Sequence, residues 1–115
     1  MADVAALRRL ALELPDAEEG TAWGTPAWRV RKKMFARLRD DGETVVVRVD
    51  RGERELLLGA EPDVFYITDH YRAYHYMLVR LAAIPEDELA EVLEDSWRRA
   101  APKRLIKQRD EAAAR

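Results

Sequence analysis

The basic residues between Arg29 and Arg48 are the part of this sequence best suited to binding an anion. The stretch holds seven lysines and arginines against three acids, a net charge of +4, while the rest of the chain carries −6. A basic segment on an acidic body is typical of a surface for an anionic partner, of which nucleic acid is the first candidate. Because the net charge of the 115-residue chain is −2, such binding depends on local clustering.

Strand-like alternation predicts where these basic side chains lie. Met34, Ala36 and Leu38 share one phase, and the residues between them share the other. We predict an arginine-rich sheet face that binds DNA or RNA, with Phe35 among the arginines, where an aromatic ring can stack on a base. The nucleic-acid-binding residues predicted in this way are Arg29, Arg31, Arg37, Arg39 and Arg48, aided by Lys103 and Arg104.

The same pattern also fits a solvated sheet face that binds nothing. In this alternative the arginines form ion pairs with Asp40, Asp41, Glu43 and neighbouring acids. Both interpretations are open at the level of sequence, because alternation places a side chain on a face without identifying its partner.

A second basic cluster runs from Arg98 to Arg109 without an acid between them. Cations at the end of a helix complement the negative end of its dipole and need no ligand. Lys103 and Arg104 follow Pro102, which should break the helix, so the dipole does not account for them.

The segment from Phe65 to Tyr76 is rich in rings, because seven of its twelve residues are aromatic or histidine. Tyrosine offers a large contact area with a polar tip, so the segment could form a pocket or an interface. It could equally cover the open end of a small core. The alternative function is therefore a small-molecule or protein-binding module, whose predicted pocket residues are Trp23, Trp28, Tyr66, His70, Tyr71 and Tyr74.

Enzyme signatures are sparse, and we predict a binding protein without catalytic activity or cofactor. Ser96 is the only serine and falls in the middle of a predicted helix, so a serine nucleophile is disfavoured. The five glycines match neither a P-loop nor a dinucleotide-binding fingerprint, and the chain has no cysteine. His70 and His75 would need a third ligand from elsewhere to hold a metal, so no metal site is predicted.

Hydrophobic periodicity predicts an α+β domain. A first helix should run between the cap Asp3 and Pro15, and residues 27–49 should form an antiparallel meander that turns near Lys32 and at Asp41-Gly42. A short helix should follow Asp50, with Leu56 to Leu58 as its apolar stripe, and then a strand over Met77–Ala83. A final helix should bury Trp97 and end at Pro102.

This order favours a two-layer sandwich, in which the N- and C-terminal helices pack on one face of an antiparallel sheet. That face should carry Met34, Leu38, Val45 and Val47. Residues 107–115 have little to bury and are expected to fray. We therefore predict one domain over residues 1–106 and a frayed tail over 107–115.

Five segments in order resemble the MmcQ/YjbR family. They are Trp23-Gly24-Thr25-Pro26-Ala27-Trp28, Lys33-Met34-Phe35-Ala36, the stretch from Phe65 to Tyr71, Leu78-Val79-Arg80-Leu81, and Trp97 with Ala101-Pro102-Lys103-Arg104-Leu105. The resemblance covers nearly the whole chain and implies a CyaY-like α+β sandwich of the double-wing DNA-binding type. It implies no catalytic residues.

The ends and apolar runs of the chain bear on its location. Met1 is followed by Ala2 and Asp3 and not by a basic and then an apolar segment, so no secretory signal is predicted. The apolar runs are too short for a membrane-spanning helix. We predict a cytoplasmic protein, with a monomer favoured.

Overall fold

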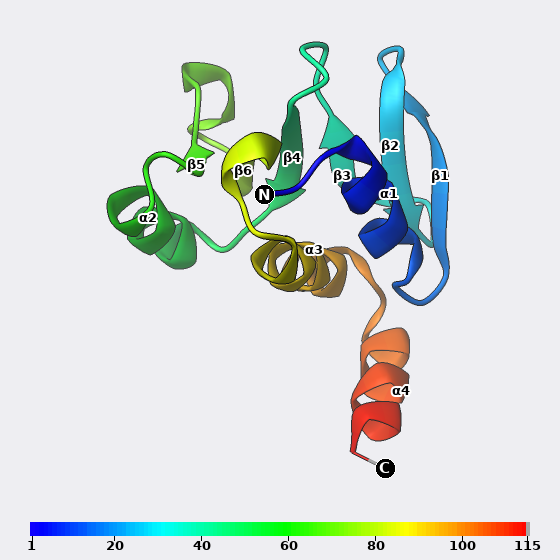
Figure 1. Ribbon diagram of the computed structural model, residues 1–115. Coiled ribbons are helices and arrows are strands. Elements are labelled where there is room, and N and C mark those ends of the chain that lie inside the picture. Colours follow the sequence, from blue (N-terminus) through cyan, green and yellow to red (C-terminus); the bar gives the residue numbers. More distant parts are fainter. Residues whose placement is uncertain (115) are drawn as a thin grey trace.

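Residues 1–114, which the computed structural model describes, form a six-stranded antiparallel sheet with helices on one face (Figure 1). The strands are β1 (Ala17–Ala22), β2 (Thr25–Val30), β3 (Lys33–Leu38), β4 (Thr44–Arg48), β5 (Phe65–Tyr66) and β6 (Tyr76–Arg80). The helices are α1 (Val4–Leu12), α2 (Arg51–Ala60), α3 (Glu86–Ala100) and α4 (Lys103–Ala113), with 3₁₀ turns η1 (Asp69–Tyr71) and η2 (Leu81–Ala83). The sheet order β1-β2-β3-β4-β6-β5 confirms the predicted α+β class.

The meander depends on turns that adopt left-handed backbone angles. Trp23 and Gly24 have φ of +52° and +81° between β1 and β2, and Arg31 and Lys32 have φ of +49° and +73° between β2 and β3. Two successive positive φ angles suit the twist of a two-residue hairpin. The predicted turns near Lys32 and at Asp41-Gly42 are confirmed, and the meander begins one strand earlier than predicted, at β1.

A β-bulge at Phe35 changes the phase of β3. Trp28 of β2 lies opposite Ala36, but Arg29 lies opposite Met34, so Phe35 is the extra residue. The side chains of Phe35 and Ala36 are both buried in the core, as occurs when two residues of a bulged strand oppose one. The prediction that Phe35 lies among the arginines is therefore wrong, and so is the placement of Met34 on the helical face, because strict alternation stops at the bulge.

Ser96 of α3 bridges the gap that the bulge leaves in the sheet. The β3–β4 ladder stops at Ala36 opposite Val47, so the carbonyl of Phe35 and the N–H of Arg48 do not bond to each other. The Ser96 hydroxyl accepts from the Arg48 N–H at 2.8 Å and donates to the Phe35 carbonyl at 2.5 Å. The only serine of the chain is thus a fully buried structural link between the helix and two strands.

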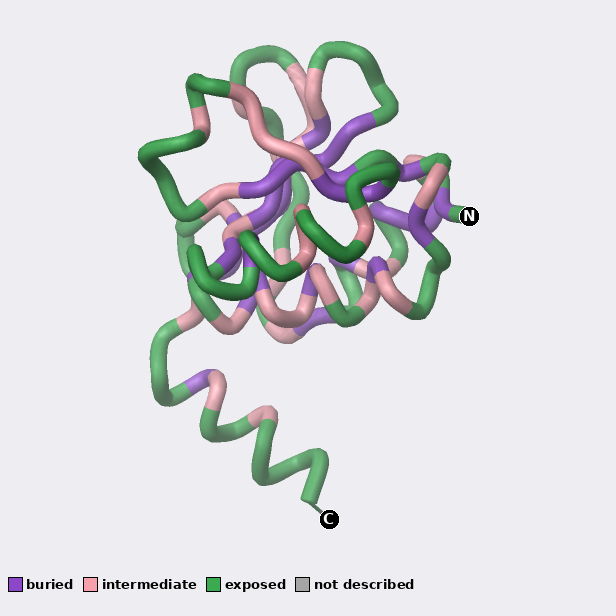
Figure 2. The backbone as a smooth tube through the Cα atoms, turned by 90° about the vertical axis from the view of Figure 1, so that its left-hand side faces the viewer, coloured by how far each residue is buried: buried purple, intermediate pink, exposed green. Residues whose placement is uncertain are grey.

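The core lies between the sheet and the helices α1 and α3. Leu89, Leu93 and Trp97 of α3 are buried against β3 and β4, and Leu7 of α1 is buried beside them. The Trp97 indole also donates to the Pro15 carbonyl at 3.0 Å. Figure 2 shows the buried residues gathered in the central strands and on the inner sides of these two helices. The burial of Trp97 and the predicted helical layer are confirmed.

The helix α2 departs from its predicted apolar stripe. Asp50 caps it as expected, accepting from the N–H groups of Gly52 and Glu53. Leu56, however, is 70% exposed, and the buried residue of the helix is Arg54. Leu57 and Leu58 are partly buried against the core, so two of the three predicted stripe residues pack inward beside the buried Arg54.

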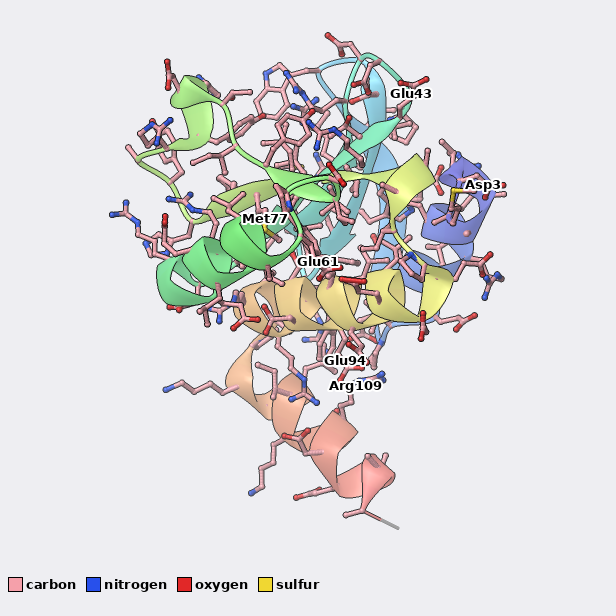
Figure 3. All side chains as sticks on the ribbon, turned by 60° about the vertical axis from the view of Figure 1, so that its left-hand side comes forward. Asp3, Glu43, Glu61, Met77, Glu94 and Arg109 are labelled. Atoms are coloured by element: carbon pink, nitrogen blue, oxygen red, sulfur yellow. The ribbon has the colours of Figure 1, made fainter. Side chains whose placement is uncertain are left out.

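The C-terminal residues form a helix where the sequence predicted a frayed tail. Residues Lys103 to Ala113 make up α4, which extends away from the body of the protein (Figures 1 and 2). Glu94 of α3 accepts from Arg109 at 2.8 Å (Figure 3), and Arg98 pairs with Asp110 at 2.7 Å. Hydrogen bonds from Arg109 hold the pKa of the Glu94 carboxyl below its ordinary value. These ion pairs attach α4 to α3, and the hydrophobic pattern of the sequence could not predict them. Arg115 lies outside the described residues.

Across residues 1–114, none of the helices combines the length and apolar character that crossing a bilayer requires.

The Ser96 bridge predicts a large stability loss for a small change. Replacing Ser96 with Ala leaves a buried N–H and a buried carbonyl without partners, at about 1–3 kcal/mol for each group. We expect chemical denaturation of Ser96→Ala to show a loss of roughly 2–4 kcal/mol. As a control, Asp95→Ala on the same helix should lose less than about 1 kcal/mol, since it removes only an exposed ion pair. Equal effects for the two variants would contradict the bridge.

Candidate functional site

The face of the sheet opposite the helices carries a set of arginines. In the strand register Ala27 lies opposite Arg37, Arg37 opposite Val46 and Val46 opposite Leu78, which defines one row across this face. Side chains two residues away along each strand share the face. We call it the arginine face; its members are Arg29, Arg37, Arg48 and Arg80, with Tyr66 and Tyr76.

Aromatic rings lie against three of these arginines. The guanidinium carbon of Arg37 is 5.1 Å from the Trp23 ring centroid, that of Arg48 is 5.9 Å from Tyr76, and that of Arg80 is 4.1 Å from Tyr66. Arg37 also donates to the Tyr71 hydroxyl at 3.1 Å. The arginine face and the aromatic pocket, which the sequence presented as alternatives, thus share one surface.

The four arginines donate to neutral acceptors. Arg29 donates to the Thr21 carbonyl at 3.1 Å, Arg48 to the Met34 carbonyl at 2.7 Å and Arg80 to the Pro62 carbonyl at 3.1 Å. Within residues 1–114 none of these arginines forms an ion pair, so their charges are positioned by the protein but not neutralised at short range. Within residues 1–114 no ion pair joins these four arginines to Asp40, Asp41 or Glu43, although two other basic-segment residues interact with acids: Arg31 pairs with Asp16, and the charge of Arg39 contributes to the lowered pKa of Asp41.

Gly20 makes room for one of these side chains. A Cβ atom built at Gly20 would lie 3.2 Å from the Nη1 atom of Arg29. The absence of a side chain therefore lets the Arg29 guanidinium lie across β1.

The remaining predicted nucleic-acid-binding residues lie elsewhere. Arg31 occupies the β2–β3 turn and pairs with Asp16 at 2.7 Å. Arg39 follows β3 and lines a hollow of about 330 Å³ with Arg37, Asp40 and Asp41. Lys103 and Arg104 lie on α4, at the end of the molecule opposite the β1–β2 hairpin tip (Figure 1), so the structure does not bring them together with the arginine face.

The predicted aromatic pocket also loses members. Trp28 is fully buried in the core on the helical side, where its indole donates to Glu19 at 3.1 Å. Trp23, in contrast, is 80% exposed at a hairpin tip. His70 stacks edge-on against Tyr71, with ring centroids 4.8 Å apart, and Tyr74 is 54% exposed. In the described part of the chain no three histidine, aspartate or glutamate side chains are placed to share a metal ion.

The buried guanidinium of Arg54 positions the aromatic segment. It is 3% exposed and donates to the carbonyls of Tyr74 at 2.7 Å, Tyr76 at 3.0 Å and Arg72 at 3.1 Å. Its Nε atom has no hydrogen-bond partner among the described residues. Sequence reasoning missed this residue, although its spacing of three and four from Leu57 and Leu58 places it on the inner side of α2.

An acidic cleft of about 670 Å³ separates α2 from α3. Its apolar floor includes Leu57, Phe65, Met77 and Val92, and its carboxylate rim consists of Asp50, Glu53, Glu61, Asp87, Glu88, Glu91 and Asp95. Figure 3 shows Glu61, the residue at the end of α2, lying close to α3. Partial burial, a hydrogen bond with Glu61 and the nearby charges of Glu61, Asp87 and Glu91 raise the pKa of Glu88 to about 7.

Comparisons with known proteins agree with this fold. The family model described as YjbR matches residues 12–99. Uncharacterized proteins of Mycobacterium tuberculosis and Mycobacterium bovis are each 35% identical over 89 residues, which cover 74% of this chain and 69% of the relative. A crystal structure of a Deinococcus radiodurans protein, described with the family-model domain DUF419, is similar with a TM-score of 0.72 and 26% identity, over 84% of this chain and 77% of that one.

The buried Arg54 should contribute more to the stability of the protein than Arg51, the other arginine of α2. Arg54→Met leaves several buried carbonyls without a donor, at roughly 1–3 kcal/mol for each group. We expect a loss of at least about 3 kcal/mol by chemical denaturation, and faster amide exchange in residues 69–76. Arg51→Met on the exposed side of the same helix serves as the control and should change stability by less than about 1 kcal/mol. Unchanged exchange in residues 69–76 of Arg54→Met would contradict the assigned role.

Glu88 should make stability fall as the pH rises. Since the pKa of Glu88 is about 7 in the folded protein and 4.5 ordinarily, the folded state retains a proton that the unfolded state releases. The stability that protonated Glu88 contributes is fully present below its ordinary pKa of 4.5 and is lost as the pH rises through its folded-state pKa of about 7. We expect Glu88→Gln to have a higher Tm than the wild type at pH 8.5 and an equal Tm at pH 4.5. The exposed residue Glu55 provides the control, because Glu55→Gln should give no such pH-dependent difference.

Proposed function

We propose, from the premise that this chain belongs to the YjbR family, that it binds nucleic acid through the arginine face without catalysing a reaction. The supporting observation is that Arg29, Arg37, Arg48 and Arg80 are held by neutral acceptors and lack ion pairs within residues 1–114. The resemblance of the family to double-wing DNA-binding folds motivates the proposal, which assigns the nucleic-acid contacts to these four arginines.

Binding through this face is driven by phosphate contacts. Each guanidinium has further N–H groups beyond those that the protein uses, and these can donate to phosphate oxygens. Because the arginines are already held in place, less side-chain entropy is lost when a phosphate binds. Such contacts position a strand on the sheet and carry little information about its base sequence.

Trp23 supplies a surface for an unpaired base. Its ring lies at the tip of the β1–β2 hairpin, next to the β3–β4 hairpin tip (Figure 1). Arg37 lies over the ring at 5.1 Å, and 80% of the side chain is exposed. An exposed indole beside a guanidinium can stack on a base while the cation contacts the adjoining phosphate. We therefore expect a preference for single-stranded over duplex nucleic acid.

A second candidate is a protein or small-molecule interface on the aromatic segment. Tyr74 is 54% exposed and its ring centroid lies 6.3 Å from that of His70, so two rings are available for contact. Apolar burial responds weakly to salt, whereas phosphate contacts weaken steeply as salt rises, and this difference separates the two functions. For either one we expect a cytoplasmic protein.

The arginine face predicts salt-dependent binding that a single charge reversal disrupts. The wild type should bind a single-stranded oligonucleotide at about 50 mM salt more tightly than roughly 100 µM, the weak end of non-specific binding. Arg37→Glu should weaken binding at least about tenfold and lower the slope of log affinity against log salt by about one. Trp23→Ala should weaken single-strand binding by about 1–3 kcal/mol and leave duplex binding unchanged. Fluorescence anisotropy measures each affinity.

Lys33→Glu is the matched control, because it makes the same charge change on the same strand, at an exposed position near the β2–β3 turn. It should retain binding within about threefold, since its only effect is on screened long-range electrostatics. Equal losses for Arg37→Glu and Lys33→Glu would mean that net charge, and not the arginine face, drives binding. No binding to either oligonucleotide form would favour the aromatic interface.

A further inference from the structure

Three arginines converge on a hollow beside the aromatic segment. The hollow has a volume of about 450 Å³ and is lined by Arg48, Arg51, Ala73, Tyr74, His75, Tyr76 and Arg99. No carboxylate lines it in the described part of the chain. Its volume falls within the range of small-ligand sites, and its charged lining is entirely cationic.

The three guanidiniums come from different elements and are each held by one contact. Arg48, at the end of β4, donates through Nε to the Met34 carbonyl at 2.7 Å. Arg51, at the start of α2, donates to the Ala73 carbonyl, and Arg99 of α3 donates through Nε to Asp95 at 3.2 Å. In each of the three, the other two guanidinium nitrogens have no hydrogen-bond partner within residues 1–114.

Charge on the neighbouring surface limits where an anion can lie. Arg48 and Arg99 also line the acidic cleft, whose rim includes Glu53 and Glu88. These carboxylates repel an anion from the cleft side of the two arginines. The attractive region is therefore the side that faces Arg51 and His75, where the lining holds no acid.

We propose that this hollow binds a phosphate monoester group. A monoester carries a charge of about −1.5 to −2 at neutral pH and presents three acceptor oxygens, whereas an internal phosphodiester carries a single charge. The three guanidiniums that line the hollow, of which Arg99 is also paired with Asp95, offer N–H donors that are free within residues 1–114 for these oxygens. Arginine forms strong charge-assisted hydrogen bonds with phosphate. The cations that line the hollow are arginines and not lysines. Because the guanidinium is planar and rigid, it favours an anion bound at a fixed position over a loosely associated counterion.

Two sources could supply this group: a small phosphorylated molecule, or the terminal phosphate of a nucleic-acid strand. Arg48 belongs both to the hollow and to the arginine face. A strand that lies on the arginine face could therefore end in the hollow. The phosphate site itself does not depend on nucleic-acid binding, and the two sources are separated by experiment.

The first experiment titrates inorganic phosphate into the full-length protein at pH 7.5, with chloride added to the reference at equal ionic strength. Two-dimensional NMR should show saturable shifts in the amides of residues 73–76 and the Nε–H groups of the lining arginines. In Arg51→Gln, which loses an exposed side chain, the phosphate affinity should fall about tenfold, the loss of one charge-assisted contact. Lys33→Gln makes the same charge change elsewhere and should leave the affinity unchanged.

The second experiment compares oligonucleotides of one sequence that carry a 5′-phosphate, a 3′-phosphate or neither. Tighter binding of one phosphorylated form, lost in Arg51→Gln but kept in Lys33→Gln, supports the terminal phosphate of a strand. Phosphate-induced shifts without any preference among the oligonucleotides support a small phosphorylated molecule.

The proposal is overturned if phosphate produces no more shift at residues 73–76 than chloride does, or if Arg51→Gln and the wild type bind phosphate equally. These outcomes are distinct from failure of the proposed function. Oligonucleotides that do not bind at all, or that bind equally to Arg37→Glu and the wild type, refute the arginine face while leaving the phosphate titration valid.

Discussion

The burial of the Arg54 guanidinium is the constraint on which the proposed binding surface depends. A buried charge is tolerated only when polar groups surround it, and here the acceptors are backbone carbonyls from Tyr71 to Tyr76. Satisfying one side chain therefore holds the later part of the aromatic segment, from Tyr71 to Tyr76, against α2. These hydrogen bonds hold the segment in which Tyr71 contacts Arg37 and in which Tyr74 and His75 line the cationic hollow, while the β4–β6 register places Tyr76 opposite Arg48.

Signals that act over a few residues allowed much of the fold to be predicted. The cap at Asp50, the turn at Asp41-Gly42 and the α3 stripe around Trp97 are local, and all three are present. The bulge at Phe35 depends instead on pairing between strands, so alternation along β3 alone could not reveal it. One inserted residue was enough to move a predicted base-stacking ring into the core.

The candidate site was predictable in part, for the same reason. Arg29, Arg37 and Arg48 follow strand phase outside the bulge, so sequence alternation placed them on one face. Arg80 was missed because its strand was judged by its apolar residues, although it shares phase with Tyr76 and Leu78. Arg31 was misplaced because the geometry of the β2–β3 turn could not be inferred from alternation, and the distance of Lys103 from the arginine face follows from the direction of α4, which is a tertiary feature. Which acids pair with which arginines is likewise a tertiary property, and strand phase carries no information about it.

Acidic and basic side chains gather on different parts of the surface, so the charge distribution of the protein is asymmetric. The acidic cleft between α2 and α3 gathers seven carboxylates on one side of Arg48 and Arg99, while the arginine face and the hollow lie on the other. Burial, together with the like charges of Glu61, Asp87 and Glu91, raises the pKa of Glu88, and ion pairing with the nearby arginines would have relieved this repulsion. A polyanion approaching a protein of net charge −2 is repelled at a distance and attracted only near the basic surface. For the proposed nucleic-acid ligand, such a field favours approach to the arginine face, even though the chain is acidic overall.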